Sequence, residues 1–307
     1  MKKAFVIIIC MWLAALCITG CGAPASAKDA EEAFSFIYMS DTQADPGVGD
    51  YTAVGELLDK ALAHESAPRL IVLGGDSVND GSSAAEWADF WAASDGITDD
   101  VTIAAVAGNH DSGPLLAEQF DYPETTAEGY FYTFTEGNVF FLMLDSNIMG
   151  GGNRDHALWI EEQLASESAK NADWRIAVAH HPLWPVADIP KDIQRAQTMR
   201  DVYLPSMEGK IDLFLCGHQH SYARATDMGI GFIQIMAASG AKGSYKAGDM
   251  EYIITTAEAP NYLIIEAGAK ALDITSFDSA GSELDGVSVI KEAGRKEISG
   301  RPCYRKL

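Results

Sequence analysis

The sequence predicts an α/β fold with mixed sheets, and two features of the chain lead to this prediction. Apolar stretches of strand length alternate with amphipathic stretches of helix length, and the last part of the chain reads as strands alone. Neither an internal repeat nor a Pro/Gly/Ser-rich linker divides residues 35–290. Because 48% of the 307 residues are hydrophobic, the chain can build one sizeable core. We therefore expect a single large domain at residues 34–290.

The first elements alternate between strand and helix. The stretch FSFIYMS (34–40) reads as a strand, and residues 52–64 then read as a helix with one apolar face. Its apolar residues, at helical spacing, are Val54, Leu57, Leu58, Ala61 and Leu62. The next expected elements are a strand at 69–73, a helix at 84–93 and a strand at 101–107. These patterns predict three strands linked by two helices.

A hairpin signal marks the middle of the chain, where YFYTFT (130–135) and VFFLMLD (139–145) flank EGN. The elements expected next are a helix at 156–164, a strand at 174–180, a helix within 192–208 and a strand at 211–215. The remaining expected strands are 231–239, 261–268 and 271–278, and residues 291–307 are expected as a C-terminal tail.

The N-terminus reads as a targeting segment. A cationic MKK precedes the apolar run AFVIIICMWLAALCI, which is the pattern of a secretory signal peptide at residues 1–20. The small residues before Cys21 resemble the lipobox of bacterial lipoproteins, in which that cysteine is lipidated. A plain transmembrane anchor is the alternative. We expect a lipidated Cys21 and a polar tether at 21–33, which would place the protein outside the cytoplasm on a bacterial cell membrane.

Charge and cysteine content exclude two classes of protein. The chain has 44 acidic and 22 basic residues, a net charge of −22, which argues against a nucleic-acid partner. Of the five cysteines, Cys10 and Cys17 lie in the signal peptide and Cys21 would carry lipid. Cys216 and Cys303 remain, too few for a disulfide scaffold.

Polar side chains follow five of the expected strands. They occur in the motifs SDTQ, GGDSVND, GNHD, AHHPLW and GHQH, which contribute Asp41, Asp76, Asn109, His110, His180, His181, His218 and His220. In open α/β sheets, ligands bind beyond the carboxyl ends of the strands. We therefore expect these side chains to converge on one site.

The chemistry of these donors predicts a metal site. Carboxylate, amide and imidazole groups without cysteine suit divalent first-row metals. If GHQH is extended, His218 and His220 point the same way, with Cα atoms roughly 6.5–7 Å apart. Paired hydrolytic metals lie about 3.5–4 Å apart, so each histidine can serve one metal. The alternatives are that both bind one metal, or that both are structural core residues.

The ordered series D-x-Q, GD, GNHD, HHP and GHQH resembles the calcineurin-like metallophosphoesterases. The stretches HHPLW and GHQHSYAR are most similar to the purple-acid-phosphatase-like branch, and the resemblance covers residues 35 to about 280. It implies a four-layer α-β-β-α sandwich of two mixed β-sheets, with a dinuclear metal site at strand ends. Two divalent ions (Mn, Fe, Zn or Mg) are the implied cofactors.

The resemblance also implies a role for each ligand. Asp76 would bridge both metals, and Asp41 and His220 would bind the first. Asn109 and His218 would bind the second, together with His180 or His181. We favour His180, because the ligand of the family precedes x-Pro, as His180 does here.

The implied reaction is hydrolysis of a phosphate ester on a small molecule. His110 would be the general acid or a transition-state donor, oriented by Asp111, which also reads as a helix N-cap. His181, Tyr222 and Arg224 would contact substrate; the alternatives are that His181 simply packs and that Tyr222 and Arg224 brace the loop. The alternative functions are a phosphodiesterase for cyclic nucleotides or glycerophosphodiesters, and a surface lipoprotein that binds a phosphorylated ligand without turnover.

Two residues depart from the family pattern. Gln43 stands where most of the family has a histidine, and it would either coordinate through its amide oxygen or only form a hydrogen bond at the site. Asn79 stands where the purple enzymes have a metal-bound tyrosine. Without a phenolate, Fe³⁺ becomes a less plausible cofactor than a divalent ion.

Overall fold

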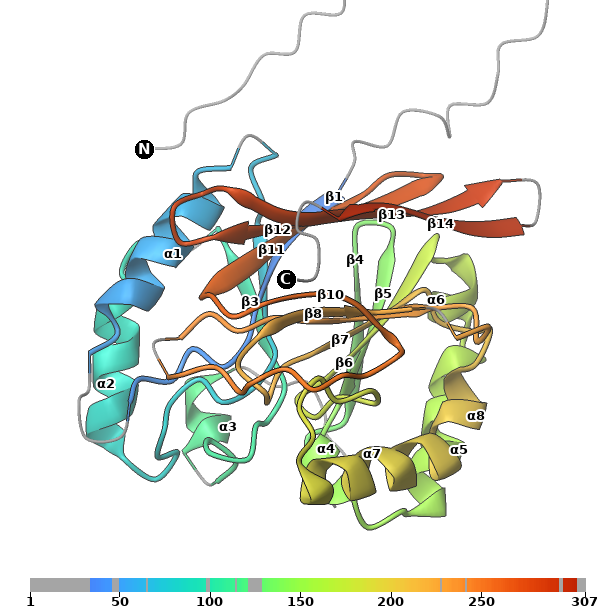
Figure 1. The fold of residues 1–307 in the computed structure, drawn as a ribbon, viewed down its shortest axis with the longest axis horizontal. Helices are drawn as coiled ribbons and strands as arrows, with labels where there is room; N and C mark the ends of the chain where they lie inside the picture. Colours follow the sequence, from blue (N-terminus) through green and yellow to red (C-terminus); the bar gives the residue numbers. More distant parts are fainter. Residues whose placement is uncertain are drawn as a thin grey trace, which may run out of the picture. The chain divides into compact units, whose positions relative to one another are not determined.

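Two mixed β-sheets carry the fold (Figure 1). The computed structural model describes residues 34–302 except 46–49, 65, 98–99, 114, 121–128, 227, 241 and 293–294, and within these residues each sheet has seven strands. The first sheet has the spatial order β14 (Arg295–Pro302), β13 (Glu283–Glu292), β12 (Ala271–Asp278), β11 (Asn261–Ala267), β1 (Phe34–Met39), β2 (Leu70–Leu73) and β3 (Thr102–Ala105). The second has the order β10 (Ile253–Ala257), β8 (Tyr222–Ala225), β9 (Ile233–Met236), β7 (Leu213–Cys216), β6 (Trp174–Ala179), β5 (Val139–Leu144) and β4 (Tyr132–Glu136).

Each sheet contains one parallel block. The strands β1, β2 and β3 are parallel in the first sheet, and β5, β6, β7 and β9 are parallel in the second. Apolar residues fill the space between the sheets, and Phe36 on β1 meets Phe141 on β5 edge to face at 5.1 Å between ring centroids. Truncating such a buried phenylalanine typically costs about 3–5 kcal/mol. This shared core holds the two parallel blocks against each other.

Helices cover the outer faces of both parallel blocks. They are α1 (Thr52–Leu62), α2 (Ala84–Ala93), α3 (Leu116–Gln119), α4 (Ser146–Met149), α5 (Arg154–Leu164), α6 (Glu167–Asn171), α7 (Pro190–Val202) and α8 (Leu204–Met207). The predicted apolar face of α1 packs on the first sheet with Trp87 and Phe90 of α2. Helices α5 to α8 pack on the second sheet. The four-layer α-β-β-α sandwich is therefore confirmed.

The start of α2 shows how local sequence sets a boundary. The Ser83 side chain accepts a hydrogen bond from the Glu86 backbone amide at 3.2 Å, which is an N-cap. The Glu86 carboxylate in turn accepts hydrogen bonds from the amides of Asn79 and Asp80, in the loop after β2. Glu86 thus connects the predicted helix at 84–93 to the loop that carries Asp76 through these hydrogen bonds.

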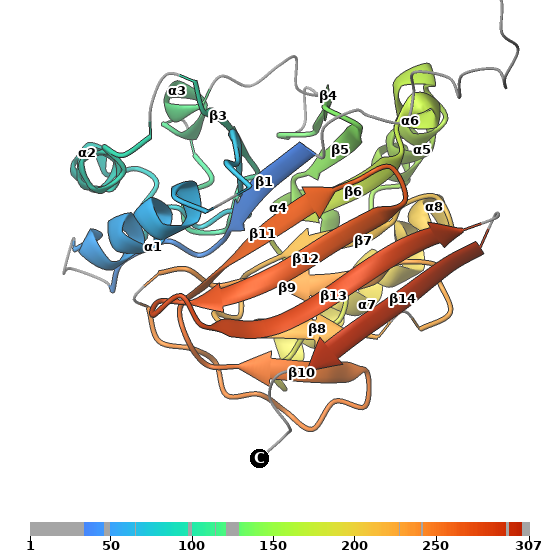
Figure 2. The same cartoon turned by 90° about the horizontal axis from the view of Figure 1, so that it is seen from above.

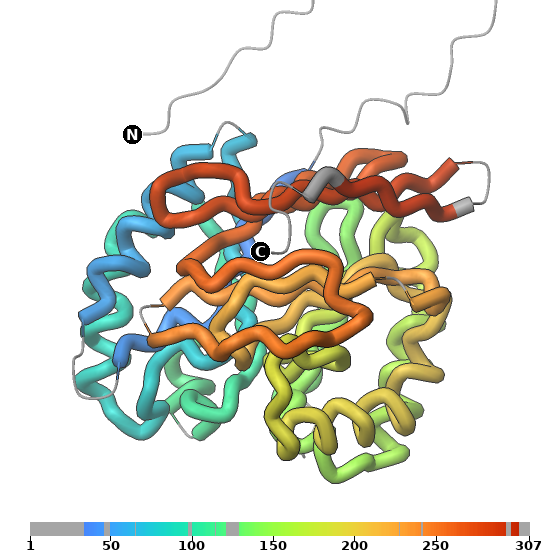
Figure 3. Tube along the Cα trace, in the orientation of Figure 1, coloured from blue at the N-terminus to red at the C-terminus, as the bar shows by residue number. Residues whose placement is uncertain are grey.

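The first sheet extends beyond residue 290, into the segment expected as a tail. Figure 3 traces β11 to β14 as consecutive antiparallel strands in orange and red. Strand β13 continues to Glu292, and β14 pairs with it. Seen from above, the outer face of β11–β14 has no described helix in front of it (Figure 2). This exposure explains why the β13 and β14 sequences are polar and lack a strong strand signal.

The predicted signal peptide, Cys21, the tether and Cys303 lie outside the described residues. Among the residues that are described, no helix is both long and apolar enough to cross a bilayer.

Candidate metal centre

The candidate ligands follow the parallel strands of both sheets. Asp41 follows β1, Asp76 follows β2, and Asn109 follows β3. From the second sheet, His180 follows β6, and the His-x-His motif follows β7. The loops are joined by backbone hydrogen bonds, including Asp41 N to Gly75 O at 2.9 Å and Gly217 N to His180 O at 2.9 Å. The predicted convergence of strand ends is therefore present in the fold.

Three buried ligands form the centre of the site. One ligand atom from each of Asp41, Asp76 and His180 lies within 4.8 Å of the others. All three side chains are almost completely buried. Two carboxylates and an imidazole in so small a buried volume are a donor set for a divalent metal ion.

The His180 ring shows that a cation fits here. Its Nδ1 lies 3.0 Å from the carbonyl oxygen of Gly74, which can only accept, so Nδ1 carries the hydrogen. The other nitrogen, Nε2, lies 3.2 Å from Asp76 Oδ2 without the geometry of a hydrogen bond. Because Asp76 Oδ2 can only accept, this buried contact is favourable only when a positive charge, either a proton on Nε2 or a cation, lies between the two atoms. This geometry favours His180 over His181 as a ligand.

The same charges shift the pKa values of these groups. Burial alone would lower the pKa of His180, but the carboxylates of Asp76 and Asp41 raise it. Burial raises the pKa of Asp41 to about 7, and the nearby Asp76 adds to this shift. Burial would also raise the pKa of Asp76, yet His180 and the His110 amide hold it below its usual range. The two buried carboxylates of Asp41 and Asp76 therefore make this site favourable for a cation.

Four of the candidate ligands have an unusual backbone conformation. Asp41, Asp76, His218 and His220 have φ values of 52°, 53°, 78° and 47°, in the left-handed region. Residues other than glycine enter this region at a cost, and such strain collects at functional sites. Gly217 makes the close approach possible, because a Cβ at this position would collide with Ser40 and Asp41.

His220 and Gln43 lie beside Asp76. The Nε2 atom of His220 is 3.5 Å from Asp41 Oδ1, and its Nδ1 donates to the Gly243 carbonyl at 3.1 Å. The Gln43 amide nitrogen lies 3.2 Å from Asp76 Oδ2 and 3.2 Å from His220 Nε2. The structure therefore brings the predicted first-site residues together, with the Gln43 amino group between Asp76 and His220.

His218 is held from two directions. Its backbone amide donates to both carboxylate oxygens of Asp41, at 3.0 and 2.8 Å. Its Nε2 lies 3.2 Å from Asp192 Oδ1, without the geometry of a hydrogen bond. Asp192 also accepts a hydrogen bond from the Gln219 amide at 2.9 Å. A carboxylate beside a histidine is a common way to orient a metal ligand.

His181 turns away from Asp76, toward the loop after β5. Its Nδ1 lies 2.9 Å from the Ser146 hydroxyl, and its ring centroid is 4.3 Å from that of His218. Burial and the nearby His180 hold its pKa well below the usual value. His181 therefore stays neutral beside the ligands.

The loop after β3 corrects the predicted role of Asp111. Both carboxylate oxygens of Asp111 accept backbone hydrogen bonds, from Gly108 at 2.7 Å and Ser77 at 2.6 Å. Asp111 therefore neither orients the His110 ring nor caps a helix, and it joins the loops after β2 and β3. The His110 ring is instead held through Nδ1, 2.9 Å from the Asn79 carbonyl oxygen. The Asn109 side chain is exposed.

Tyr222 and Arg224 brace the sheets and do not lie with the candidate ligands. The Tyr222 hydroxyl donates to Asp285 Oδ2 at 2.6 Å, and Arg224 forms a bidentate ion pair with the same carboxylate at 2.6 and 3.1 Å. All three side chains are buried, and they join β8 of the second sheet to β13 of the first. The predicted contact with substrate is therefore wrong, because the polar ends of both side chains are used inside the sandwich.

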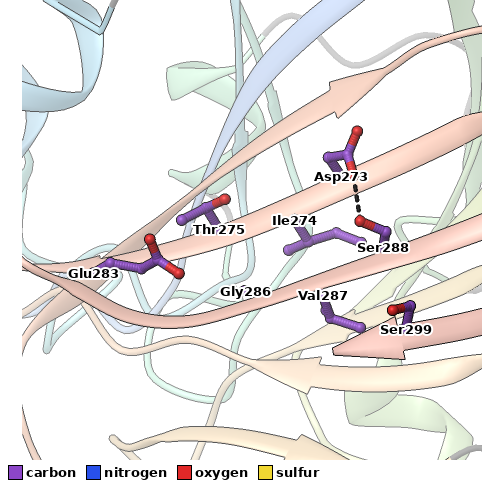
Figure 4. A pocket seen from close by; sticks show the side chains of 8 residues that line it. All are labelled: Asp273, Ile274, Thr275, Glu283, Gly286, Val287, Ser288 and Ser299. Carbon is purple, nitrogen blue, oxygen red and sulfur yellow. Dashed lines mark hydrogen bonds between the residues drawn. The ribbon is translucent and has the colours of Figure 1, made fainter. Parts of the chain in front are cut away.

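A hollow lies on β12, β13 and β14 (Figure 4). It has a volume of about 290 Å³ and is lined by Asp273, Ile274, Thr275, Glu283, Gly286, Val287, Ser288 and Ser299. The Ser288 hydroxyl donates a hydrogen bond to Asp273 within it. No candidate ligand lines this hollow, so it is separate from the metal centre.

Four residues at the site were not expected from the sequence. Ser146 lies against His181, and Asp192 lies beside His218 and is bonded to Gln219. Lys242 reaches the site from the loop after β9. The sequence could have indicated Lys242 as a site residue through its position, since it follows an expected strand as the predicted site residues do. Asp192 and Gln219 act through contacts between distant segments, which no local pattern shows.

The family model described as calcineurin-like phosphoesterase matches residues 34–222. Purple acid phosphatase 23 of Arabidopsis thaliana is 23% identical over 140 residues, which is 42% of this chain and 30% of that protein.

Solved structures share the fold. Purple acid phosphatase PPD1 from yellow lupin (Lupinus luteus) seeds has a TM-score of 0.68 at 16% identity, covering 86% of this chain and 55% of that one. GAP50, the anchor in the inner membrane complex of Plasmodium, has a TM-score of 0.63 at 18% identity, covering 85% and 90%. PhoD has a TM-score of 0.62 at 12% identity, covering 92% and 74%. The matches to the two purple acid phosphatases span only about a third to a half of their length.

Proposed function

The chain belongs to the calcineurin-like phosphoesterase family, and from this premise we propose that it hydrolyses phosphate esters with the help of bound metal. The observation that carries the proposal is the buried group of Asp41, Asp76 and His180, in which His180 Nε2 faces an Asp76 carboxylate oxygen at 3.2 Å. These three residues would hold a divalent ion, and His218, His220 and Asn109 are the further candidate ligands. When bound, such an ion supplies Lewis-acid catalysis and lowers the pKa of a water molecule.

The residues of the chain position the reacting groups. The amide of His110 donates to Asp76 Oδ1 at 2.8 Å, so the ligand and the half-buried His110 ring are fixed relative to each other. The ring is anchored at Nδ1 by the Asn79 carbonyl, which leaves Nε2 on the side of Lys242. We propose that, with substrate bound, His110 Nε2 takes up a proton from solvent and passes it to the leaving oxygen of the ester. A positioned acid of this kind contributes about 10²–10⁴-fold.

A hydrolysis screen tests this function. The full chain in mild detergent would be freed of metal and then loaded with Mn²⁺, Mg²⁺, Zn²⁺ or Fe²⁺. p-Nitrophenyl phosphate and bis(p-nitrophenyl) phosphate are offered side by side. We expect metal-dependent release of p-nitrophenol, and the ratio of the two rates distinguishes a monoesterase from a diesterase. Phosphate-ester binding without turnover under any metal would contradict the proposal and favour a ligand-binding lipoprotein.

We also propose that Cys21 anchors the protein to the outer face of a bacterial cell membrane. The cationic MKK, the apolar run and the small residues before Cys21 support this placement. Cys21→Ala should move the protein from the detergent phase to the aqueous phase in a Triton X-114 partition, because the lipid attachment atom is lost. Cys10→Ala is the matched control and should partition as the native chain does. An unchanged detergent-phase fraction for Cys21→Ala would indicate an uncleaved helical anchor instead.

A further inference from the structure

Lys242 contributes a positive charge to the candidate metal centre. Its Nζ lies 3.3 Å from Gln43 Oε1 and 3.1 Å from His110 Nε2. The side chain is half-buried, in the loop that follows β9. It lies within hydrogen-bond reach of both the predicted catalytic histidine and the residue that departs most from the family pattern.

The loop around Lys242 is fixed to the motifs on both sides. Ser239 and Gly240 donate backbone hydrogen bonds to the carbonyls of Ser40 and Asp41, at 2.7 and 2.8 Å. Gly243 accepts from His220 Nδ1, and the Tyr245 ring stacks on the His220 ring with centroids 5.1 Å apart. Lys242 therefore lies between fixed points and not at the end of a free loop.

The hydrogen bonds determine which way the Gln43 amide points. The Lys242 ammonium can only donate, and the Asp76 carboxylate can only accept. The Gln43 oxygen must therefore face Lys242, and its amino group must face Asp76. The second N–H of Gln43 meets His220 Nε2, which is an acceptor because His220 Nδ1 donates to Gly243. Gln43 thus presents hydrogens, not a lone pair, to the two neighbouring ligands.

The same reasoning applies to His110. Its Nδ1 donates to the Asn79 carbonyl, so its Nε2 accepts from Lys242. The ammonium has three hydrogens and is bonded to two protein acceptors, which leaves one for a phosphate oxygen. Lysine is a common phosphate ligand in proteins.

The two halves of the site therefore differ. On the side of His180 and His218, the Nε2 atoms of both rings lie 3.2 Å from a carboxylate oxygen and lack a partner with hydrogen-bond geometry among the described residues. On the side of His220 and Gln43, Lys242 already brings a positive charge, and hydrogen bonds satisfy the facing atoms. The first half fits a metal ion, and the second half is already occupied by protein groups.

We infer that Lys242 takes the place of one of the two metals that the family resemblance implies, so that the chain holds one divalent ion and binds the substrate phosphate through Lys242. This inference rests on the proposed function, because it concerns the phosphate site of that reaction. It also gives Gln43 a role, which is to hold the ammonium and to fill the space beside Asp76 and His220.

Metal content and phosphate binding test this inference without requiring turnover. The full chain in detergent would be saturated with Mn²⁺, and bound metal would be measured by elemental analysis. Binding of inorganic phosphate would then be measured by calorimetry. We expect one Mn²⁺ per native chain. Lys242→Gln should keep that metal and bind phosphate about 10- to 100-fold more weakly, since a hydrogen bond to a charged group is lost. Lys242→Arg should recover part of the affinity.

Lys246→Gln is the matched control, because Lys246 is exposed on the same loop. This variant should bind phosphate as the native chain does. The double variant Gln43→His/Lys242→Gln should gain a second Mn²⁺, since it removes the ammonium and adds an imidazole. Two Mn²⁺ in the native chain, or a phosphate affinity of Lys242→Gln within about twofold of native, would overturn the inference. One Mn²⁺ and Lys242-dependent phosphate binding without any hydrolysis would support it and would contradict the proposed function alone.

Discussion

Asp76→Asn should weaken metal binding and lower kcat/KM by more than about 100-fold, which exceeds the usual effect of removing an outer hydrogen-bond partner of a metal site. Asp76 is the residue with the most roles at the site. Its Oδ1 accepts from the His110 amide, and its Oδ2 accepts from Gln43 and faces His180. An asparagine must place its amino group against one of these donors, and it also removes the negative charge that attracts the cation.

The fold itself should tolerate Asp76→Asn, because the substitution keeps the shape of the side chain and removes its repulsion with Asp41. Elemental analysis and steady-state kinetics on the same preparation check the prediction, and circular dichroism checks the fold. Asp80→Asn is the matched control, since Asp80 is exposed on the same loop and its side chain accepts hydrogen bonds from Ser82. Native metal content together with native activity in Asp76→Asn would remove this residue from the centre.

His110→Ala should keep its metal and lose about 10²–10⁴-fold in kcat, the range expected for a positioned general acid. The backbone amide that supports Asp76 remains in this variant, so the metal ligands should stay in place. The loss should be smallest on p-nitrophenyl phosphate, whose leaving group needs little help from a proton, and largest on alkyl phosphates.

The dependence on leaving group separates catalysis from mere packing, which would slow all substrates alike. His64→Ala serves as the control, because His64 lies after α1, packs against Phe277 and hydrogen-bonds with Ser66. A His110→Ala protein that loses its metal along with its rate would show that this histidine supports the centre and does not act on substrate.

The fold was largely predictable because apolar pattern and strand length agree along most of the chain. Helix α2 has the predicted ends, since Ser83 and Glu86 form a local cap that the sequence shows directly. Strands β13 and β14 were not predicted, because they form one face open to solvent and their sequences are correspondingly polar. Burial, and not backbone pairing, produces the apolar pattern on which such predictions depend.

The metal centre was predictable for the residues that follow strand ends and less so for those that support them. Asp41, Asp76 and His180 meet as expected, because parallel strands bring their carboxyl ends to one edge. The role of Asp111 depends on which backbone amides approach it, which only the packed loops decide. Arg224 likewise has a buried partner, Asp285, that is 61 residues away in the chain.

The left-handed backbone at Asp41, Asp76, His218 and His220 limits how far this protein can be stabilised by mutation. Each strained residue costs on the order of 1–3 kcal/mol, while a whole domain is stable by only about 5–15 kcal/mol. Glycine would relieve the strain at any of the four positions, but it would remove a candidate ligand with it. Selection for thermal robustness alone would therefore erode the metal centre. The same strain leaves the sandwich less tolerant of random substitution, even in strands remote from the site.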